Sequence, residues 1–217
     1  VEEAIAFGAE INTGEQVTDW ESGNSGVTVE TDHDHYTAEQ LVVTAGAWSK
    51  ELLPAIKNHV QPERQVLGWF QPNRPEYFTT DVFPVFNLSV DEGRYYGFPI
   101  HAGNGVKIGR FHHLQEKVDA DTIDRTITAK DEAALRDGVR NYFPFANGPT
   151  EMLKTCIFTN SPDEHFIIGK IHGVVIGAGF SGHGFKFCSV VGELLADLAL
   201  KGTTDHDIGM FDPARLS

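Results

Sequence analysis

Polar and apolar residues alternate through the middle of the chain, a pattern typical of strands with one buried face. Runs rich in Val, Phe and Tyr, separated by Gly, Pro, Asn and Asp, predict strands at 65–70, 82–90, 95–99 and 105–111. One helical pattern interrupts them at 129–142, where Leu135, Val139 and Tyr142 recur at helical spacing and Thr128 with Asp131 forms a capping-box-like start. Residues 55–150 are therefore predicted to form an antiparallel sheet with one helix.

The region before this sheet has an α/β pattern. Residues 1–54 predict a short helix at 1–7, a strand at 15–20, and a hairpin from 27–31 to 40–44. The apolar run 41–48 ends in small residues, as when a buried strand brings its backbone close to a ligand.

The region after the sheet returns to α/β. Residues 151–217 predict a buried strand at 174–176, a glycine-rich turn, and a helix that ends near Lys201, with Gly202 at its C-terminus. The fold class is thus mixed, α+β and α/β, with a partial α/β domain made of 1–54 and 151–217.

Composition limits the possible partners. A net charge of −14 over 217 residues argues against nucleic acid. We expect no membrane span, because no stretch approaches about 18 consecutive apolar residues, and no signal peptide is visible. Two cysteines cannot form a cysteine-based zinc site, and they favour a reduced, cytoplasmic setting. The His and Asp residues at 32–35 are interpreted as a solvated turn, so no metal site is predicted.

Three glycines at the predicted strand-to-helix turn match G-x-G-x-x-G, namely Gly177, Gly179 and Gly182. A nicotinamide-binding fingerprint also needs a second strand with an acidic residue about 20 positions on, and here the helix fills that interval. The free N–H groups of the turn, together with Lys186, instead predict a site for an anion. The alternative is that Lys186 is an ordinary surface lysine.

Several segments carry a family resemblance. The blocks 154–159, 163–168 and 179–187, in this order, resemble the family of FAD-dependent amine oxidases that includes monomeric sarcosine oxidase and N-methyltryptophan oxidase. The blocks 95–99, 106–109 and 46–48 extend the resemblance over nearly the whole chain. The family's N-terminal segment, with its glycine-rich phosphate loop and an arginine that meets the substrate carboxylate, is absent, and the chain opens on Val1 within an apparent helix. We therefore expect a preceding segment, with 1–54 and 151–217 as parts of the FAD-binding domain and 55–150 as the substrate domain.

The resemblance implies roles for residues around the flavin. Cys156 matches the cysteine that is joined to the flavin through a thioether; without the motif, a free core cysteine would be the simpler interpretation. Cys188 is predicted to pack against the apolar side of its helix. The resemblance also predicts flavin contacts from two short segments, Gly46-Ala47-Trp48 and Gly182-His183-Gly184.

The resemblance also implies roles toward substrate and oxygen. Lys107 matches the lysine that promotes the reaction with O₂, and Tyr96 and Lys186 match residues that bind the substrate carboxylate. A family histidine normally follows the lysine by four positions, but Phe111 stands there, so His112 is assigned the role with His113 as the alternative. Phe158 replaces a tyrosine of sarcosine oxidase, which puts sarcosine itself in doubt as the substrate.

The resemblance implies an oxidase of secondary amino acids, N-methylated or cyclic. Such an enzyme would convert its amino-acid substrate and O₂ to an imine and H₂O₂. The chain by itself is expected to lack this activity and, without the preceding segment, to self-associate or to be of low stability. Two alternatives stay open, an inactive fragment and a ligand-binding β module without flavin.

Overall fold

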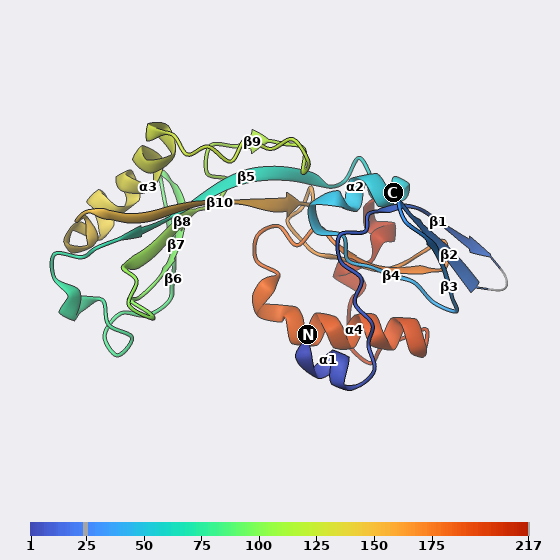
Figure 1. The fold of residues 1–217 in the computed structure, drawn as a ribbon. Coiled ribbons are helices and arrows are strands. Elements are labelled where there is room, and N and C mark those ends of the chain that lie inside the picture. Colours follow the sequence, from blue (N-terminus) through green and yellow to red (C-terminus); the bar gives the residue numbers. More distant parts are fainter. Residues whose placement is uncertain (24–25, 217) are drawn as a thin grey trace.

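The computed structural model describes residues 1–23 and 26–216, which form two lobes joined by two long strands (Figure 1). These strands are β5 (Gln61–Phe70) and β10 (Thr150–Asn160), and they pair antiparallel along their length. Both chain ends lie in the same lobe, and the other lobe holds the central part of the chain.

The lobe far from the termini is built on a six-stranded antiparallel sheet. Its order is β10-β5-β8-β7-β6, and β9 pairs with the N-terminal part of β5, at Glu63 and Arg64. The remaining strands are β6 (Phe86–Val90), β7 (Gly93–Phe98), β8 (Val106–Arg110) and β9 (Glu116–Lys117). The four strands predicted in this region are thus present, although β6 is shorter than the predicted run 82–90.

Helix α3 (Ala129–Tyr142) covers one face of this sheet and has the predicted bounds. Its capping box is confirmed: the Thr128 side chain accepts a bond from the Asp131 N–H, and the Asp131 carboxylate accepts one from the Thr128 N–H. The helix packs its apolar stripe into the sheet to form the core of the lobe. The fully buried members of this core are Val66, Phe70, Tyr95, Val106, Ile108, Leu135, Val139 and Ala146.

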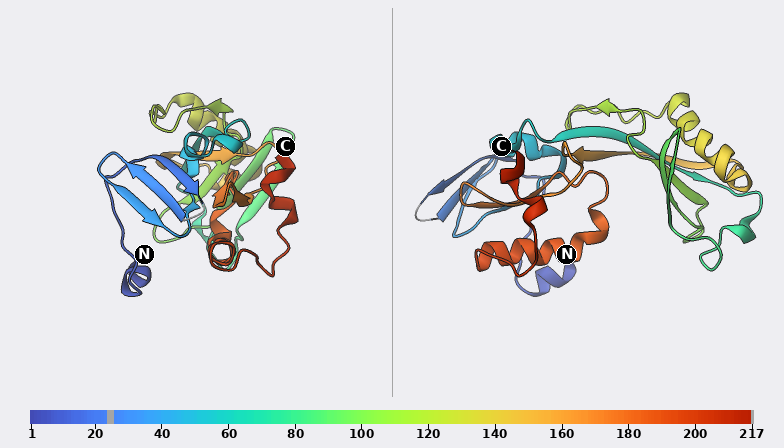
Figure 2. Two further views of the ribbon diagram at one scale, coloured as in Figure 1. Left: turned by 90° about the vertical axis from the view of Figure 1, so that its right-hand side faces the viewer. Right: turned by 180° about the vertical axis from the view of Figure 1, so that it is seen from behind.

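The other lobe contains a three-stranded sheet of order β11-β12-β4. Strand β12 (Val174–Ala178) pairs antiparallel with β11 (Ile167–Ile171) and parallel with β4 (Val42–Val43). Helix α4 (Cys188–Leu200) covers one face and buries Val175, Leu194 and their neighbours. On the opposite face Ile176 packs with Leu53 and Ile56, so the strands are covered on both faces, as parallel pairing requires. Figure 2 shows that α3 and α4 lie in different lobes.

A separate three-stranded sheet, β1 (Val17–Gly23), β2 (Gly26–Thr31) and β3 (His35–Ala38), precedes β4. The predicted hairpin partner at 40–44 is wrong, because residues 35–38 pair with β2 and Val42–Val43 join β12 instead. The pairing of β4 depends on a strand some 130 positions later, which a local pattern cannot indicate. Two short helices, α1 (Glu2–Ala6) and α2 (Ser49–Leu52), complete this lobe.

Strand β10 was not predicted, although it is the longest strand among the described residues. It begins at Thr150, where the predicted sheet region 55–150 was expected to end, and it continues in the six-stranded sheet to Asn160. The chain therefore leaves the sheet ten residues later than the pattern indicated. No helix in the described part of the chain is long and apolar enough to cross a membrane.

Candidate active site

The register of the six-stranded sheet brings three of the predicted site residues, Tyr96, Lys107 and Cys156, onto one face. Residues directly opposite each other in an antiparallel pair point to the same side, and neighbours along a strand point to opposite sides. Cys156 lies opposite Gln65, Lys107 opposite Trp69, and Phe98 opposite Lys107. Because Gln65 and Trp69 are four positions apart on β5, Cys156 and Lys107 share a face. Helix α3 covers the other face, so this one is called the open face.

Tyr96 and Lys107 occupy the open face on neighbouring strands. Tyr96 lies opposite Gly109, where a Cβ atom would overlap the phenol ring, so glycine is needed for the ring to lie across β8. Burial, with a smaller contribution from Cys156, raises the pKa of Tyr96 far above its usual value, so its hydroxyl is neutral at physiological pH. The Lys107 ammonium lies 5.1 Å from the ring centroids of both Trp69 and Phe98, which hold a cation by their quadrupoles.

Cys156 is a free, half-buried thiol on β10. Burial raises its pKa, and the positive charges of Lys107 and Arg125 oppose this shift without cancelling it. The thiol is therefore protonated near neutral pH. A thiolate, the form that attacks an electrophile, becomes accessible at higher pH or when a further positive potential is added.

Phe158, two positions beyond Cys156, links the open face to the glycine-rich turn after β12. It is buried, and a Cβ atom on Gly182 would overlap its ring. The backbone N–H of Ser181 donates to Thr159 O at 2.9 Å, and the Ser181 hydroxyl accepts from the Ser161 N–H at 3.1 Å. The turn is thus fixed against the end of β10, with Gly182 in the positive-φ region that favours glycine.

The same turn sets the positions of His183 and Lys186. A ring nitrogen of His183 lies 2.9 Å from the carbonyl oxygen of Glu164, and the His183 carbonyl accepts a bond from the Lys186 ammonium at 2.9 Å. Lys186 lies in a 3-10 turn (Phe185–Phe187) just before α4. Its ammonium is exposed and available to an anion at the mouth of the site.

The predicted flavin contacts at Gly46-Ala47-Trp48 form a 3-10 turn beside β10. Gly46 has a φ of 54°, and no neighbouring atom fills the space where its Cβ would be. Trp48 is half exposed, and its indole N–H donates to Asp121 at 2.7 Å. The turn thus presents backbone and one aromatic side chain next to the strand that carries Cys156.

The two adjacent histidines lie in different environments. His112, with a φ of 52°, lies between two carboxylates, with Nδ1 3.1 Å from Glu63 and Nε2 2.8 Å from Glu164. Burial alone would lower the pKa of His112, but the two carboxylates outweigh it and the pKa is raised. His113 is buried with Nε2 3.0 Å from Asp131, and burial lowers its pKa despite this contact.

A cavity of about 480 Å³ opens between the open face and the glycine-rich turn. Its lining includes Phe98 and Phe111 and four of the residues predicted to act on substrate or cofactor, namely Tyr96, Gly182, His183 and Lys186. His112 does not line it, and Phe111 does. The catalytic role of His112 stays a prediction. Its imidazole is held by Glu63 and Glu164 outside the lining of the cavity.

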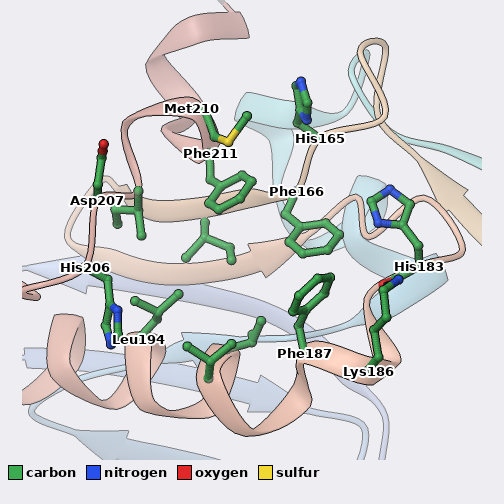
Figure 3. A pocket seen from close by; sticks show the side chains of 14 residues that line it. His165, Phe166, His183, Lys186, Phe187, Leu194, His206, Asp207, Met210 and Phe211 are labelled. Carbon is green, nitrogen blue, oxygen red and sulfur yellow. The ribbon is translucent and has the colours of Figure 1, made fainter.

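A second cavity, of about 500 Å³, lies on the other side of Lys186 (Figure 3). The rings of Phe166, Phe187 and Phe211 face one another across it, and α4 and the C-terminal segment form its walls. It contains none of Tyr96, Lys107 and Cys156. The first cavity contains Tyr96 together with His183 and Lys186, and Lys107 and Cys156 lie on the same sheet face outside its lining. The first cavity is therefore the candidate active site.

Residues 1–198 match the family described as FAD dependent oxidoreductase, which covers most of the chain. The chain belongs to this family. Among individual relatives, it is 45% identical over 215 residues to a monomeric sarcosine oxidase from Bacillus sp. (strain NS-129), covering 96% of this chain and 55% of that protein. It is 36% identical over 208 residues to an N-methyl-L-tryptophan oxidase from Salmonella enteritidis PT4, covering 93% and 54%.

Solved structures of other proteins share the fold of this chain. The chain resembles L-proline dehydrogenase from P. horikoshii with a TM-score of 0.80 at 22% identity, covering 99% of this chain and 57% of that one. It resembles NikD, an unusual amino acid oxidase essential for nikkomycin biosynthesis, in its open form with a TM-score of 0.75 at 23% identity, covering 97% and 57%. The chain spans about half the length of the curated relatives it matches.

The residues around the open face fit an FAD. A flat ring system needs closely approaching backbone, and Gly46 supplies it, because no atom lies where its Cβ would be; at Gly182 that space is filled by the Phe158 ring. Cys156 offers a half-buried thiol between these two turns, and Lys107 supplies a cation on the same face. The donor set therefore suits an aromatic cofactor that acquires negative charge on reduction.

Sequence reasoning missed three residues of the site. Trp69 and Arg94 lie on strands whose register cannot be read from one sequence, and Phe111 was passed over in favour of His112. The signal for Phe111 was available, because it stands at the position where the family's histidine is expected. The one-residue difference in spacing was interpreted as a bulge that would bring His112 to that place.

Proposed function

We propose that the complete protein is an FAD-dependent oxidase of secondary amino acids, N-methylated or cyclic, that releases an imine and H₂O₂. The observation that supports this best is the gathering of Tyr96, Lys107, Cys156 and Phe158 on one face of the sheet. Of these four residues, Tyr96 lines the cavity that also contains Lys186. The names of the relatives, sarcosine oxidase and N-methyl-L-tryptophan oxidase, point to the same substrate class.

Substrate binding is assigned to the two ends of the cavity. Lys186 binds the substrate carboxylate, because its exposed ammonium is tethered at the rim through the His183 carbonyl. Tyr96 donates a second hydrogen bond, since its raised pKa keeps the hydroxyl protonated. Phe98 and Phe111 form the apolar wall beside them, and Phe158 packs against Phe111. The two polar groups fix the orientation of the substrate while the wall excludes water from its C–N bond.

A flavin held by these residues would supply the redox chemistry, namely acceptance of a hydride from the substrate and transfer of two electrons to O₂. Lys107 contributes a fixed positive charge next to the oxygen that is being reduced. A preorganised cation of this kind stabilises developing negative charge, and removing such a group typically costs about 10²- to 10³-fold in rate. The aromatic rings of Trp69 and Phe98 keep the ammonium in place.

Cys156 is assigned the covalent link to the flavin, and Gly46-Ala47-Trp48 and Gly182-His183-Gly184 are assigned its noncovalent contacts. Because burial raises the pKa of Cys156, the chain keeps the thiol unreactive until the cofactor and its surroundings are assembled. His112 is assigned a supporting role, in which it holds Glu164 and through it the His183 turn.

The experiment that tests the function measures peroxide from the full-length protein with N-methyl and cyclic amino acids at millimolar concentration. We expect H₂O₂ in equal amount to the substrate consumed. Flavin that is reduced by these substrates but reoxidised only by an artificial dye would make the protein a dehydrogenase instead. Flavin that none of them reduces would refute the substrate class.

A further inference from the structure

Phe111 lies in a row of three aromatic rings, of which its own and that of Tyr96 line the candidate active site. Its ring centroid is 5.0 Å from that of Tyr96, in an edge-to-face arrangement, and 5.8 Å from that of Phe158. Tyr96 and Phe158 are both on the open face, and Phe111 lines the cavity that also contains Lys186. Phe111 therefore faces the space in which the substrate is proposed to bind.

The backbone explains why Phe111, and not the following histidine, faces the cavity. The Phe111 N–H donates to Arg94 O at 2.8 Å, which continues the pairing of β7 and β8 by one residue beyond Arg110. At His112 the chain enters the positive-φ region, which costs free energy in a residue other than glycine. The contacts of His112 with Glu63 and Glu164 offset this cost and hold its imidazole behind the wall.

Arg94 holds the Phe111 ring in position. Its guanidinium lies 4.0 Å from the ring centroid, within cation–π distance, and donates to Glu164 at 3.1 Å. The same carboxyl group contacts His112, so one acidic side chain supports the residues on both sides of the turn. A ring clamped in this way offers a preorganised apolar surface, and a ligand that packs on it loses little free energy in ordering it.

The chemistry of the cavity indicates what packs there. Lys186 provides positive charge for a carboxylate, and none of the described residues that line the cavity is acidic. Tyr96, Phe98 and Phe111 provide an aromatic surface that a substrate as small as sarcosine leaves largely uncovered. Resting on the function proposed above, we propose that Phe111 determines specificity, and that the substrate is a secondary amino acid with an aromatic or large aliphatic side chain.

The test uses two carboxylates that cannot be oxidised, propanoate and 3-phenylpropanoate, which differ by one phenyl ring. Their dissociation constants for the full-length flavoprotein are measured from the change in flavin absorbance. Burial of a phenyl ring predicts that 3-phenylpropanoate binds about 10- to 100-fold more tightly than propanoate. Phe111→Ala is expected to reduce this ratio to below about threefold, and Phe111→Leu to an intermediate value.

Phe145→Ala is the matched control, since it removes the same side chain from a half-exposed position outside the cavity, and it is expected to leave the ratio unchanged. A ratio near one in the wild type, or an unchanged ratio in both Phe111 variants, overturns the inference. The binding measurement needs no turnover, so this failure is separable from failure of the proposed function. Peroxide formed equally well from sarcosine and N-methylphenylalanine would leave the oxidase standing and contradict only the specificity.

Discussion

The two faces of the six-stranded sheet differ in almost every physical respect, although the same strands form both. The face under α3 is a closed apolar core in which Phe70, Ile108 and Leu135 have no exposed surface. The open face carries a phenol, an ammonium and a thiol, all partly accessible. Tyr95 and Tyr96 are adjacent in sequence and lie on opposite faces, as do Val106 and Lys107. Period-two alternation thus separates the residues that stabilise the lobe from those proposed to act in catalysis.

The turn after β8 extends the same contrast to a pair of histidines. His113 lies on the closed side against Asp131, and His112 lies between carboxylates near the cavity wall. Their pKa values are shifted in opposite directions, downward for the buried ring and upward for the one between the carboxylates. Identical side chains at consecutive positions therefore acquire different chemistry from the faces they occupy.

The largest expected effect is a loss of folding stability on the closed side of the sheet, caused by replacing Asp131. Asp131 is fully buried and binds both the Arg64 guanidinium, at 2.7 and 3.1 Å, and His113. Burial opposes its ionisation, but Arg64, Thr128 and His113 outweigh this and hold the pKa of Asp131 well below its usual value. Asp131→Ala removes the buried carboxylate partner of Arg64, which keeps only the half-exposed Glu116 at 3.1 Å, and it also removes half of the capping box of α3. We expect a loss of about 3–5 kcal/mol in the free energy of unfolding.

The measurement is denaturant unfolding of the full-length protein, and Asp137→Ala on the exposed side of the same helix is the control. Asp137 forms only a surface pair with Arg140, so we expect a change within about 0.5 kcal/mol. Equal effects from the two substitutions would contradict the view that the closed side carries the stability.

On the open face, the largest expected effect is kinetic and comes from Lys107. Lys107→Met is expected to slow reoxidation of the reduced flavin by O₂ by about 10²- to 10³-fold, because a developing negative charge loses its fixed cation. Anaerobic reduction by substrate should stay within about threefold of wild type. Stopped-flow absorbance measures the two half-reactions separately. Lys170→Met, at an exposed lysine on β11, is the control, and equal slowing of both half-reactions by Lys107→Met would remove Lys107 from the proposed oxygen chemistry.

The smallest expected effects are on how the free energy of unfolding changes with pH, and they differ in sign between His112 and His113. The lowered pKa of His113 gives stability that is present above about pH 6.5 and is lost as the pH falls, because the unfolded chain then binds the extra proton. The raised pKa of His112 gives stability that is present below about pH 6.5 and is lost as the pH rises through its folded pKa.

Unfolding of His112→Gln and His113→Gln between pH 5 and 8 tests these signs. The difference in unfolding free energy between wild type and variant should grow with pH for His113 and shrink with pH for His112. Each slope is limited to about 1.4 kcal/mol per pH unit, since one proton is involved. Slopes of the same sign would show that the two rings do not occupy different environments.

The elements that could be predicted from sequence are those in which several short-range features, such as caps, turn residues and apolar spacing, indicate the same structure. Helix α3 has a capping box and an apolar stripe, and β7 and β8 have clear alternation between glycine-rich turns. Strand β10 lacks that alternation because it runs from one lobe to the other and its neighbours change along its length. The exposed strand β3 carries no apolar signal, and β4 is defined by its distant partner β12.

For the candidate site, the family resemblance identified the residues, but only the structure shows which of them lie next to one another. Cys156, Lys107 and Tyr96 could be named from motifs, but their common face follows only from the register of four strands. Cys188 was predicted to pack on the apolar side of its helix, and this was wrong, since it is exposed at the first position of α4. The place of Phe111 depends on the positive φ of His112, which is a compromise between backbone strain and two carboxylate contacts that sequence does not reveal.

The central claim is that the open face holds the flavin at Cys156, and the covalent state of the cofactor tests it most directly. Full-length wild type, Cys156→Ser and Cys188→Ser are denatured in acid, filtered and measured by intact mass and flavin absorbance. We predict that flavin stays with the wild-type and Cys188→Ser chains and is released from Cys156→Ser, which should otherwise fold normally because serine is close in size. Release of flavin from all three proteins, or its retention by Cys156→Ser, would contradict the account.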